Sequence, residues 1–79
     1  MHRVHLASDT LAWIRYSPEQ LVMELGFQNG GVYAYFDVPT ATYNELLAAE
    51  SKGRYFNHHI RNHFRAQPVR LNAVGQKTK

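Results

Sequence analysis

The sequence predicts a single α+β domain in which a three-stranded antiparallel β-meander is followed by two α-helices that pack on the sheet. Three observations lead to this prediction. Apolar and polar residues alternate on both sides of Asn29-Gly30, a third alternating stretch precedes them, and after Pro39 the apolar residues follow a helical period instead. A chain of 79 residues has the size of one small domain with one hydrophobic core.

The central hairpin is predicted between Leu21 and Val38. Asn-Gly between alternating stretches is typical of a two-residue loop, because a type I′ turn needs positive φ at both central residues. This loop places Phe27 opposite Val32 and gives the hairpin one apolar face, made of Leu21, Met23, Leu25, Phe27, Val32, Ala34, Phe36 and Val38. The other face then carries Val22, Glu24, Gly26, Tyr33, Tyr35 and Asp37.

A first strand is predicted from Thr10 to Tyr16, and the turn that follows it is Ser17-Pro18-Glu19-Gln20. With Ser17 opposite Gln20, the apolar face is extended by Ala12, Ile14 and Tyr16. The opposite face receives Leu11, Trp13 and Arg15. Residues 1–7 show no pattern and are expected to form a flexible lead-in to a domain that covers residues 8–66.

The first helix is predicted over residues 40–53, directly after the proline that ends the third strand. Gly53 would end this helix, and Thr40 would cap its start, or Thr42 and Glu45 would form a capping box. Its stripe towards the sheet contains Tyr43, Leu46, Leu47 and, as the polar member, Glu50. The second helix is predicted over residues 53–64, with one apolar face made of Phe56, Ile60 and Phe64.

Charge is distributed unevenly along the chain. The net charge of the whole chain is +3, but residues 1–50 have a net charge of −4 and residues 51–79 have one of +7. Residues 67–79 are expected to form a basic, largely disordered tail with a short edge strand at 69–73. The asymmetry indicates an anionic partner, and the alternative is that these charges only keep the helix surfaces soluble.

Composition excludes several classes of protein. The chain has no cysteine, so it has neither disulfides nor a thiolate zinc site. No apolar run approaches the roughly 20 residues that span a bilayer, and the first residues lack the apolar segment of a signal peptide. We therefore expect a cytoplasmic protein that does not bind a membrane.

Four short motifs follow one another along residues 8–64. They are the turn Tyr16-Ser17-Pro18, the strand G-G-V-Y-x-Y-F-x-V-P, the helix with Tyr43 and Leu46, and S-K-G-x-Y-F-N-x-x-I-R from Ser51 to Arg61. In this order they resemble the KTSC domain, a module named for the C-terminus of some lysyl-tRNA synthetases. That family also occurs as stand-alone bacterial or phage proteins. The resemblance implies a small module with a suggested role in RNA binding and no established set of catalytic residues.

Three aromatic residues form the first candidate site. In the predicted register Trp13, Tyr33 and Tyr35 share the sheet face opposite the main core. Exposed aromatic rings on an antiparallel sheet stack single-stranded bases in several RNA-binding modules, so this face is a candidate for nucleic-acid binding. The alternative is that the C-terminal helix or tail covers the face and makes these rings a second layer of core, because Leu11 and Val22 also lie there.

Basic residues of the second helix and of the loop before it form the second candidate site. Their side chains would contact phosphates, and they are Lys52, Arg54, Arg61 and Arg65. The start of this helix is also a candidate for anion binding, through Ser51, Gly53 and Asn57. The alternative is structural: the serine caps the helix, the glycine supplies a left-handed turn and the asparagine bonds a nearby loop.

The sequence shows no catalytic or metal-binding motif. His59 and His63 have helical spacing, but no glutamate follows the first of them and no third ligand is evident. Acidic residues are scattered through the first fifty positions, so we predict no catalytic residues, metal or cofactor. The predicted function is a small non-enzymatic module that binds RNA through its basic C-terminal helix and loop. The alternative is a protein-interaction module recruited to a larger enzyme or phage assembly.

Overall fold

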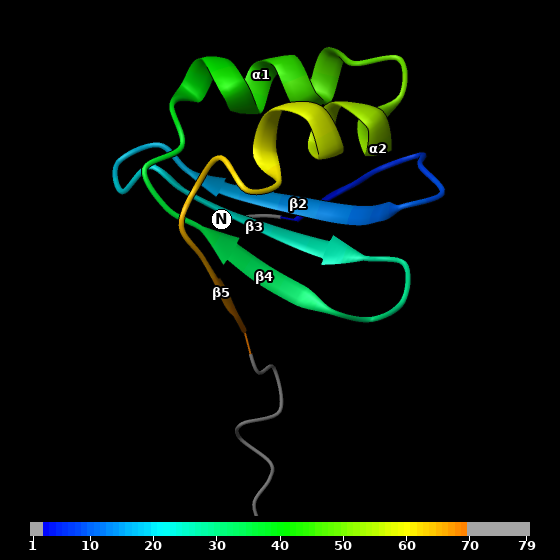
Figure 1. Ribbon diagram of the computed structural model, residues 1–79, viewed down its shortest axis with the longest axis horizontal. Helices are drawn as coiled ribbons and strands as arrows, with labels where there is room; N and C mark the ends of the chain where they lie inside the picture. Colours follow the sequence, from blue (N-terminus) through cyan, green and yellow to red (C-terminus); the bar gives the residue numbers. More distant parts are fainter. Residues whose placement is uncertain (1–2, 70–79) are drawn as a thin grey trace, which may run out of the picture.

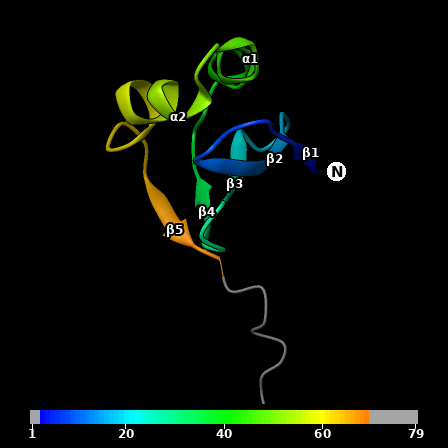
Figure 2. The same cartoon turned by 90° about the vertical axis from the view of Figure 1, so that its right-hand side faces the viewer.

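A computed structural model of the chain describes residues 3–69 (Figure 1). The elements, in chain order, are β1 Val4–His5, β2 Leu11–Ser17, β3 Val22–Phe27, β4 Val32–Tyr35, α1 Thr40–Ala48, α2 Lys52–Tyr55, the π-helical turn η1 Phe56–Ile60 and β5 Ala66–Pro68. The strands form one layer, and the helices form a second layer over one face of the sheet (Figures 1 and 2). Within residues 3–69, none of the helices has the length and apolar character needed to cross a membrane.

The sheet has five strands in the order β1-β2-β3-β4-β5, and each neighbouring pair is antiparallel. The predicted α+β class is confirmed, but the prediction of three strands is wrong. The two additional strands lie at the edges of the sheet and have two and three residues. Strands this short do not show an alternating pattern, so the sequence did not reveal β1 and placed the C-terminal edge strand at 69–73 instead of at β5.

Both edge strands fall in stretches for which we expected other structure. β1 lies in the expected lead-in, where Val4 pairs with Ile14 of β2. β5 begins three residues before the edge strand predicted at 69–73, and its Pro68 is tolerated because an edge strand leaves one side unpaired. The rest of the predicted tail, residues 70–79, lies outside the described residues.

The loop between β3 and β4 is one residue longer than predicted. The Phe27 N–H donates to the Gly31 carbonyl at 2.8 Å, and the Gly30 N–H donates to the Phe27 carbonyl at 2.9 Å. The loop therefore runs from Gln28 to Gly30, and its glycine takes the left-handed conformation with φ of 96°. The Gln28 N–H donates to the Thr10 carbonyl at 2.9 Å, which ties this loop to β2.

The longer loop shifts the register of β4 against β3 by one residue. Leu25 pairs with Tyr33 rather than with Ala34. Because side chains alternate along a strand, this shift turns Tyr33 and Tyr35 towards the helices and turns Val32 and Ala34 to the opposite face. The predicted division of the hairpin into an apolar and a tyrosine-bearing face is therefore wrong for β4.

β2 follows the prediction over most of its length. Ile14 and Tyr16 face the helices and are buried. The pairing with β3 is irregular between Leu11 and Trp13, and this bulge changes which side chains point inwards. As a result Leu11 is fully buried in the core, whereas Ala12, which we predicted there, is only half-buried.

The hydrophobic core lies between the sheet and the helices. Its fully buried side chains come from two strands, β2 and β3, from the segment after β4 and from both helical segments, and they are Leu11, Ile14, Met23, Leu25, Val38, Leu46 and Ile60. The predicted stripe of the first helix is confirmed for its apolar members, because Tyr43 and Leu47 pack against this core beside Leu46. Its predicted polar member, Glu50, lies after the end of α1.

The first helix starts as predicted but is shorter. Pro39 precedes α1 in an extended conformation, and no side chain caps the helix, so the proposed threonine caps are wrong. The Tyr16 hydroxyl donates to the Val38 carbonyl at 2.6 Å just before the helix begins. α1 ends at Ala48, and Gly53 lies inside α2 rather than at the end of α1.

The second helical segment consists of α2 and η1 and ends at Ile60. Phe56 and Ile60 are buried on one face, as the four-residue spacing predicts. Phe64, the third residue of that face, lies in the turn after the helix and still packs against the core. The helical segment therefore stops four residues earlier than predicted without losing its apolar contact with the sheet.

Candidate nucleic-acid interface

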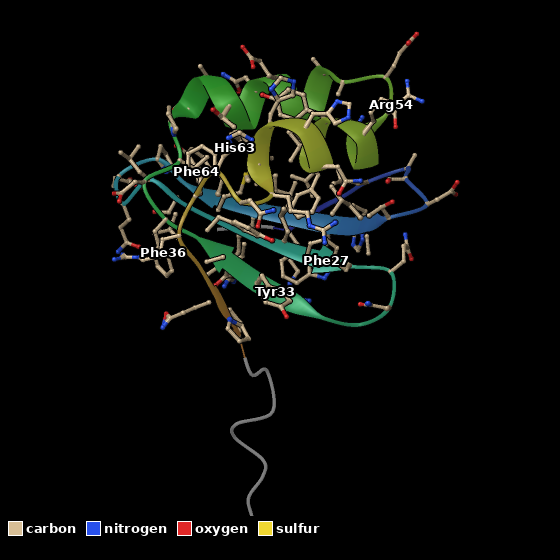
Figure 3. All side chains as sticks on the ribbon, viewed as in Figure 1. Phe27, Tyr33, Phe36, Arg54, His63 and Phe64 are labelled. Carbon is tan, nitrogen blue, oxygen red and sulfur yellow. The ribbon has the colours of Figure 1, made fainter. Side chains whose placement is uncertain are left out.

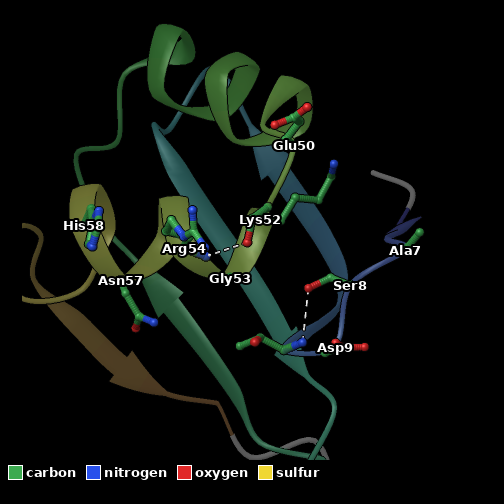
Figure 4. A pocket seen from close by; sticks show the side chains of 11 residues that line it. Ala7, Ser8, Asp9, Glu50, Lys52, Gly53, Arg54, Asn57 and His58 are labelled. Carbon is green, nitrogen blue, oxygen red and sulfur yellow. Dashed lines mark hydrogen bonds between the residues drawn. The ribbon is translucent and has the colours of Figure 1, made fainter.

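A cavity of about 550 Å³ opens between the loop before β2 and the start of α2 (Figure 4). We call it the Arg54 cavity. Its main polar side chains are Lys52, Arg54, Asn57 and His58 on the helix side and Ser8 and Asp9 on the loop side. The predicted basic loop and helix therefore border a hollow surface rather than a flat one.

Two serine side chains hold the walls of the Arg54 cavity. The Ser8 Oγ accepts hydrogen bonds from the N–H groups of Thr10 and Leu11, both at 3.1 Å. On the opposite wall the Ser51 Oγ accepts from the Arg54 N–H at 3.2 Å. Ser51 thus caps α2, which is the structural role that we gave as the alternative to anion binding.

The two walls meet where Gly53 contacts Thr10. A Cβ atom at Gly53 would lie only 2.6 Å from the Thr10 Oγ1, so a glycine is required for the helix to approach β2 this closely. Among the described residues the glycine with positive φ is Gly30, so the alternative reading of Gly53 as a left-handed turn is wrong. The role of Gly53 is close packing between α2 and the start of β2.

A second cavity, of about 610 Å³, lies between the β3–β4 hairpin and η1. We call it the aromatic cavity, because its lining includes Phe27, Tyr33, Tyr35 and Phe56, together with Arg61. The rings meet edge to face, with centroid distances of 6.1 Å for Phe27 and Tyr33 and 5.3 Å for Phe27 and Phe56. Figure 3 shows Phe27 and Tyr33 next to each other on the hairpin, below the helices.

The two tyrosines of the aromatic cavity differ in exposure. Tyr33 is 41% exposed, whereas Tyr35 is 7% exposed and packs edge to face on Phe56 at 5.9 Å. Burial raises the pKa of Tyr35 to about 12, and the neighbouring Tyr33 adds to this increase while Arg61 opposes it. The raised pKa extends the range in which the Tyr35 hydroxyl is a hydrogen-bond donor from about pH 10 to about pH 12.

The two cavities adjoin each other, because Thr10 and Asn57 line both. The Asn57 Oδ1 accepts from the Arg61 Nη1 at 3.5 Å, which places the asparagine between the two cavities and close to a guanidinium. We call the two neighbouring cavities together the composite groove. It extends along α2 and η1 from Arg54 at one end to Tyr33 at the other.

Three cationic side chains line the composite groove. The Lys52 Nζ donates to the Ala49 carbonyl at 3.0 Å and so binds the C-terminal end of α1, where a cation is favourable. Arg54 and Arg61 are exposed, and neither takes part in an ion pair within residues 3–69. The two arginines are therefore the cations that this groove presents to a ligand.

Acidic side chains moderate the charge of this surface. Asp9 and Glu50 line the Arg54 cavity together with the basic residues. The aromatic cavity is lined by Arg61 and by no acidic residue of the described chain. An anion therefore meets the least opposition near Arg61.

The structure separates the three residues of the predicted aromatic face. Tyr33 and Tyr35 lie on the helix side of the sheet, whereas Trp13 lies on the opposite side, so the prediction of one shared face is wrong. The indole of Trp13 covers Gly26 and fills the space that a side chain there would need. The Arg3 guanidinium lies 4.1 Å from the centroid of the Trp13 ring.

Arg65 is the one predicted phosphate contact that lines neither cavity. Its guanidinium lies 4.9 Å from the centroid of the Phe36 ring. Figure 3 shows Phe36 towards the opposite end of the sheet from Arg54. The other three basic residues, together with Gly53 and Asn57, are brought together along the composite groove.

The histidines of this region do not assemble into a metal site. Within residues 3–69, no three His, Cys, Asp or Glu side chains come close enough to hold a metal ion. η1 ends at Ile60, so His63 does not lie one helical turn from His59. The ring of His59 instead stacks on Tyr55 at a centroid distance of 4.5 Å.

Sequence reasoning missed Thr10, Phe27 and Phe56 as members of the site. We assigned both phenylalanines to the apolar faces that form the core, and both do pack there. Their rings also reach the border of the core, where they line the aromatic cavity. One signal could have indicated that Phe27 lies at the border of the core: it is the last residue of its strand, directly before the hairpin loop.

Comparisons with known proteins agree with the fold and the motifs. The sequence model of the KTSC domain matches residues 7–64. An uncharacterized protein of Stutzerimonas stutzeri is 44% identical over 57 residues, which are 72% of this chain and 80% of that protein. A lysine–tRNA ligase of Nostoc sp. is 41% identical over 55 residues, which are 70% of this chain and 10% of the ligase. The crystal structure of a KTSC domain protein from Yersinia pestis matches with a TM-score of 0.85 and 29% identity, over 87% of this chain and 97% of that one. The chain therefore belongs to the KTSC domain family.

Proposed function

We propose that this KTSC domain is an RNA-binding module that contacts phosphates along the composite groove. One observation carries the proposal: Arg54 and Arg61, without ion pairs among residues 3–69, share a groove with the exposed ring of Tyr33. Guanidinium groups bind phosphate oxygens in a bidentate manner, and an aromatic ring beside them offers a surface on which a base stacks.

The relatives support RNA as the ligand. The matched lysine–tRNA ligases act on tRNA by their name, and the stretch similar to this chain is 10% of their length. A domain attached to an enzyme that handles tRNA is in a position to add phosphate contacts to the same RNA. The same surface in a separate small chain would bind RNA on its own, with an affinity limited by its few cations.

Salt dependence tests this proposal directly. If Arg54 and Arg61 each neutralise one phosphate, the logarithm of the association constant should fall with the logarithm of salt concentration with a slope of about −1.4. Fluorescence anisotropy of a labelled single-stranded RNA, measured over a series of salt concentrations, gives this slope. No binding to the wild-type chain at low salt would falsify the proposal.

Charge-neutralising variants locate the contacts. Arg54→Gln and Arg61→Gln should each weaken RNA binding and reduce the slope by about 0.7. Arg15→Gln is the matched control, because it removes the same charge on the opposite face of the sheet, where Arg15 pairs with Glu24. The control should keep the slope of the wild type.

The second candidate function is protein interaction, and the same relatives favour it. A domain that makes up a tenth of a large ligase is in contact with, or close to, the rest of that enzyme. The mixed charges of the Arg54 cavity, with Asp9 and Glu50 beside the cations, also suit a protein surface. This function predicts stoichiometric binding of one protein that survives nuclease treatment and is lost in the Arg54→Gln variant.

A further inference from the structure

We infer that the aromatic cavity receives one unstacked base of single-stranded RNA, with the backbone of the strand passing Asn57 towards Arg54. The inference rests on the proposed function and adds two points to it. It names the RNA class, single-stranded rather than double-stranded. It also places the base inside the aromatic cavity, stacked on Tyr33 and with its polar edge beside Tyr35, Asn57 and Arg61.

Tyr33 combines exposure with a fixed position. Its side chain is 41% exposed, and its ring is held edge to face by Phe27 at 6.1 Å. The cavity that it lines, at about 610 Å³, falls within the range of small-ligand sites, so a nucleobase can enter it. An aromatic ring that is held by a neighbour loses little conformational entropy when a base stacks on it.

Polar groups beside this ring match the edge of a base. Tyr35, Asn57 and Arg61 line the same cavity. The Tyr35 hydroxyl makes no hydrogen bond within the described part of the chain, and like any tyrosine hydroxyl it is protonated at neutral pH. A protonated hydroxyl, an amide and a guanidinium provide both donors and an acceptor for the polar edge of a base.

The shape of the composite groove favours a single strand. Base stacking on Tyr33 requires an open base face, and in a duplex these faces are stacked on one another. The aromatic cavity adjoins the Arg54 cavity at Thr10 and Asn57, which line both. A strand whose base enters at Tyr33 therefore places its following phosphates along Arg61 and Arg54.

On the opposite face of the sheet, Trp13 and Arg15 already have partners within residues 3–69. There the Trp13 ring is covered by the Arg3 guanidinium at 4.1 Å, and Arg15 is paired with Glu24. Trp13 is the single tryptophan of the chain, which makes it a reporter for ligands on that face. Binding in the composite groove should leave its fluorescence unchanged.

The experiment compares Tyr33 variants on a labelled single-stranded oligoribonucleotide and on a duplex of the same length. Tyr33→Leu should weaken binding of the single strand by about 5- to 150-fold, the effect of losing one stacked base. Tyr33→Phe keeps the ring and should bind like the wild type. The duplex should bind more weakly than the single strand and should not respond to Tyr33→Leu, and Trp13 emission should stay constant during the titrations.

The outcomes separate this inference from the proposed function. If the single strand binds in a salt-dependent manner but Tyr33→Leu has no effect, the inference is wrong and the proposed function stands. Equal binding of duplex and single strand also overturns it, as does quenching of Trp13 on saturation, which indicates binding on the opposite face. Circular dichroism of Tyr33→Leu shows whether the variant is folded. A comparison of single-strand binding by Tyr33→Phe and Tyr33→Trp extends the test to rings with different stacking surfaces.

Discussion

Aromatic and charged side chains have different contacts on the two faces of the sheet. On the helix face, Tyr35 and Phe56 pack edge to face at the border of the core. Beside them Tyr33 is exposed, and Arg54 and Arg61 take part in no ion pair within residues 3–69. The surface with free binding groups thus lies at the edge of the layer that the helices cover.

On the opposite face the aromatic and charged side chains contact one another. Trp13 covers Gly26 and is itself covered by Arg3, and Arg15 pairs with Glu24. No helix of residues 3–69 lies over this face, yet its aromatic ring and its charges already have partners (Figure 2). The comparison teaches that an uncovered sheet is not by itself a binding surface, because neighbouring side chains on the sheet can occupy its groups.

The largest expected effect on stability comes from a variant that removes the contact between η1 and the sheet. Ile60→Ala should lower the free energy of unfolding by about 2–5 kcal/mol, because Ile60 is fully buried between these layers. Ile60→Val is the matched control and should cost about 0.5–1.5 kcal/mol. Urea denaturation followed by Trp13 fluorescence gives both values, and equal losses for the two variants would contradict the packing described here.

The next effect concerns the opposite face. Gly26→Ala should lower the free energy of unfolding by about 1–3 kcal/mol, because the new Cβ would overlap the Trp13 indole. In a Trp13→Ala background the same change should cost almost nothing, since the clash is gone. Thermal denaturation by circular dichroism measures this cycle. RNA binding of Gly26→Ala, measured while the variant is folded, should equal that of the wild type if only the helix face binds.

A smaller effect tests the charges of the composite groove. Asp9→Asn should strengthen RNA binding by about 2- to 5-fold at low salt, because a carboxylate that repels phosphate is removed from the Arg54 cavity. Glu19→Gln, in the exposed loop between β2 and β3, is the control with the same change in charge. Anisotropy titrations that show the same gain for both variants would assign the effect to net charge instead.

The smallest effect appears only at alkaline pH and concerns the helix side. Burial raises the pKa of Tyr35 to about 12. Burial also raises the pKa of Tyr55 to about 12, and the hydrogen bond of 2.6 Å from its hydroxyl to the Glu45 carboxylate contributes to this increase. In the unfolded chain a tyrosine titrates near pH 10, so the unfolded state loses these protons first. The free energy of unfolding should therefore fall between about pH 10 and 12 and be unaffected by these groups below pH 10.

Two phenylalanine variants check the alkaline prediction. Tyr35→Phe and Tyr55→Phe each remove one late-titrating group, so each should reduce the fall in stability between pH 10 and 12. Titration of tyrosinate absorbance in the folded chain should lose one step near pH 12 in each variant. A fall that is identical in both variants and in the wild type would assign it to other groups.

The helical part of this fold could be predicted from the sequence because its signals are local. Large apolar residues four positions apart, such as Phe56 and Ile60, define one face of a helix, and both are buried. Leu46 on α1 was likewise predicted to face the sheet from its helical spacing, and it is fully buried. The order of the basic residues along the second helical segment was equally visible, although only the fold shows that Arg54 and Arg61 share a groove while Arg65 does not.

The register of the hairpin could not be predicted from local signals. Asn29-Gly30 suits loops of two and of three residues, and contacts distant in sequence decide between them. The Gln28 side chain donates to the Ser8 carbonyl at 3.0 Å, and its N–H donates to the Thr10 carbonyl. The resulting shift by one residue moved Tyr33 to the other face, and with it the candidate site.

The turn between β2 and β3 shows why some register errors have no such consequence. We predicted Ser17 opposite Gln20, but Ser17 pairs with Val22. This error is an even number of residues, so Ile14 and Tyr16 stay on the predicted face of the sheet.

The pairing of β5 with β4 links the composite groove to the order of folding. β2, β3 and β4 are joined by short loops, whereas residues 36–65, with both helices, separate β4 from β5. Closing a longer loop costs more conformational entropy, so we expect this pairing to form after the two short hairpins. η1 lies inside that segment and forms one wall of the aromatic cavity, which is therefore complete only in the finished domain. A ligand that binds there stabilises the contacts that form last.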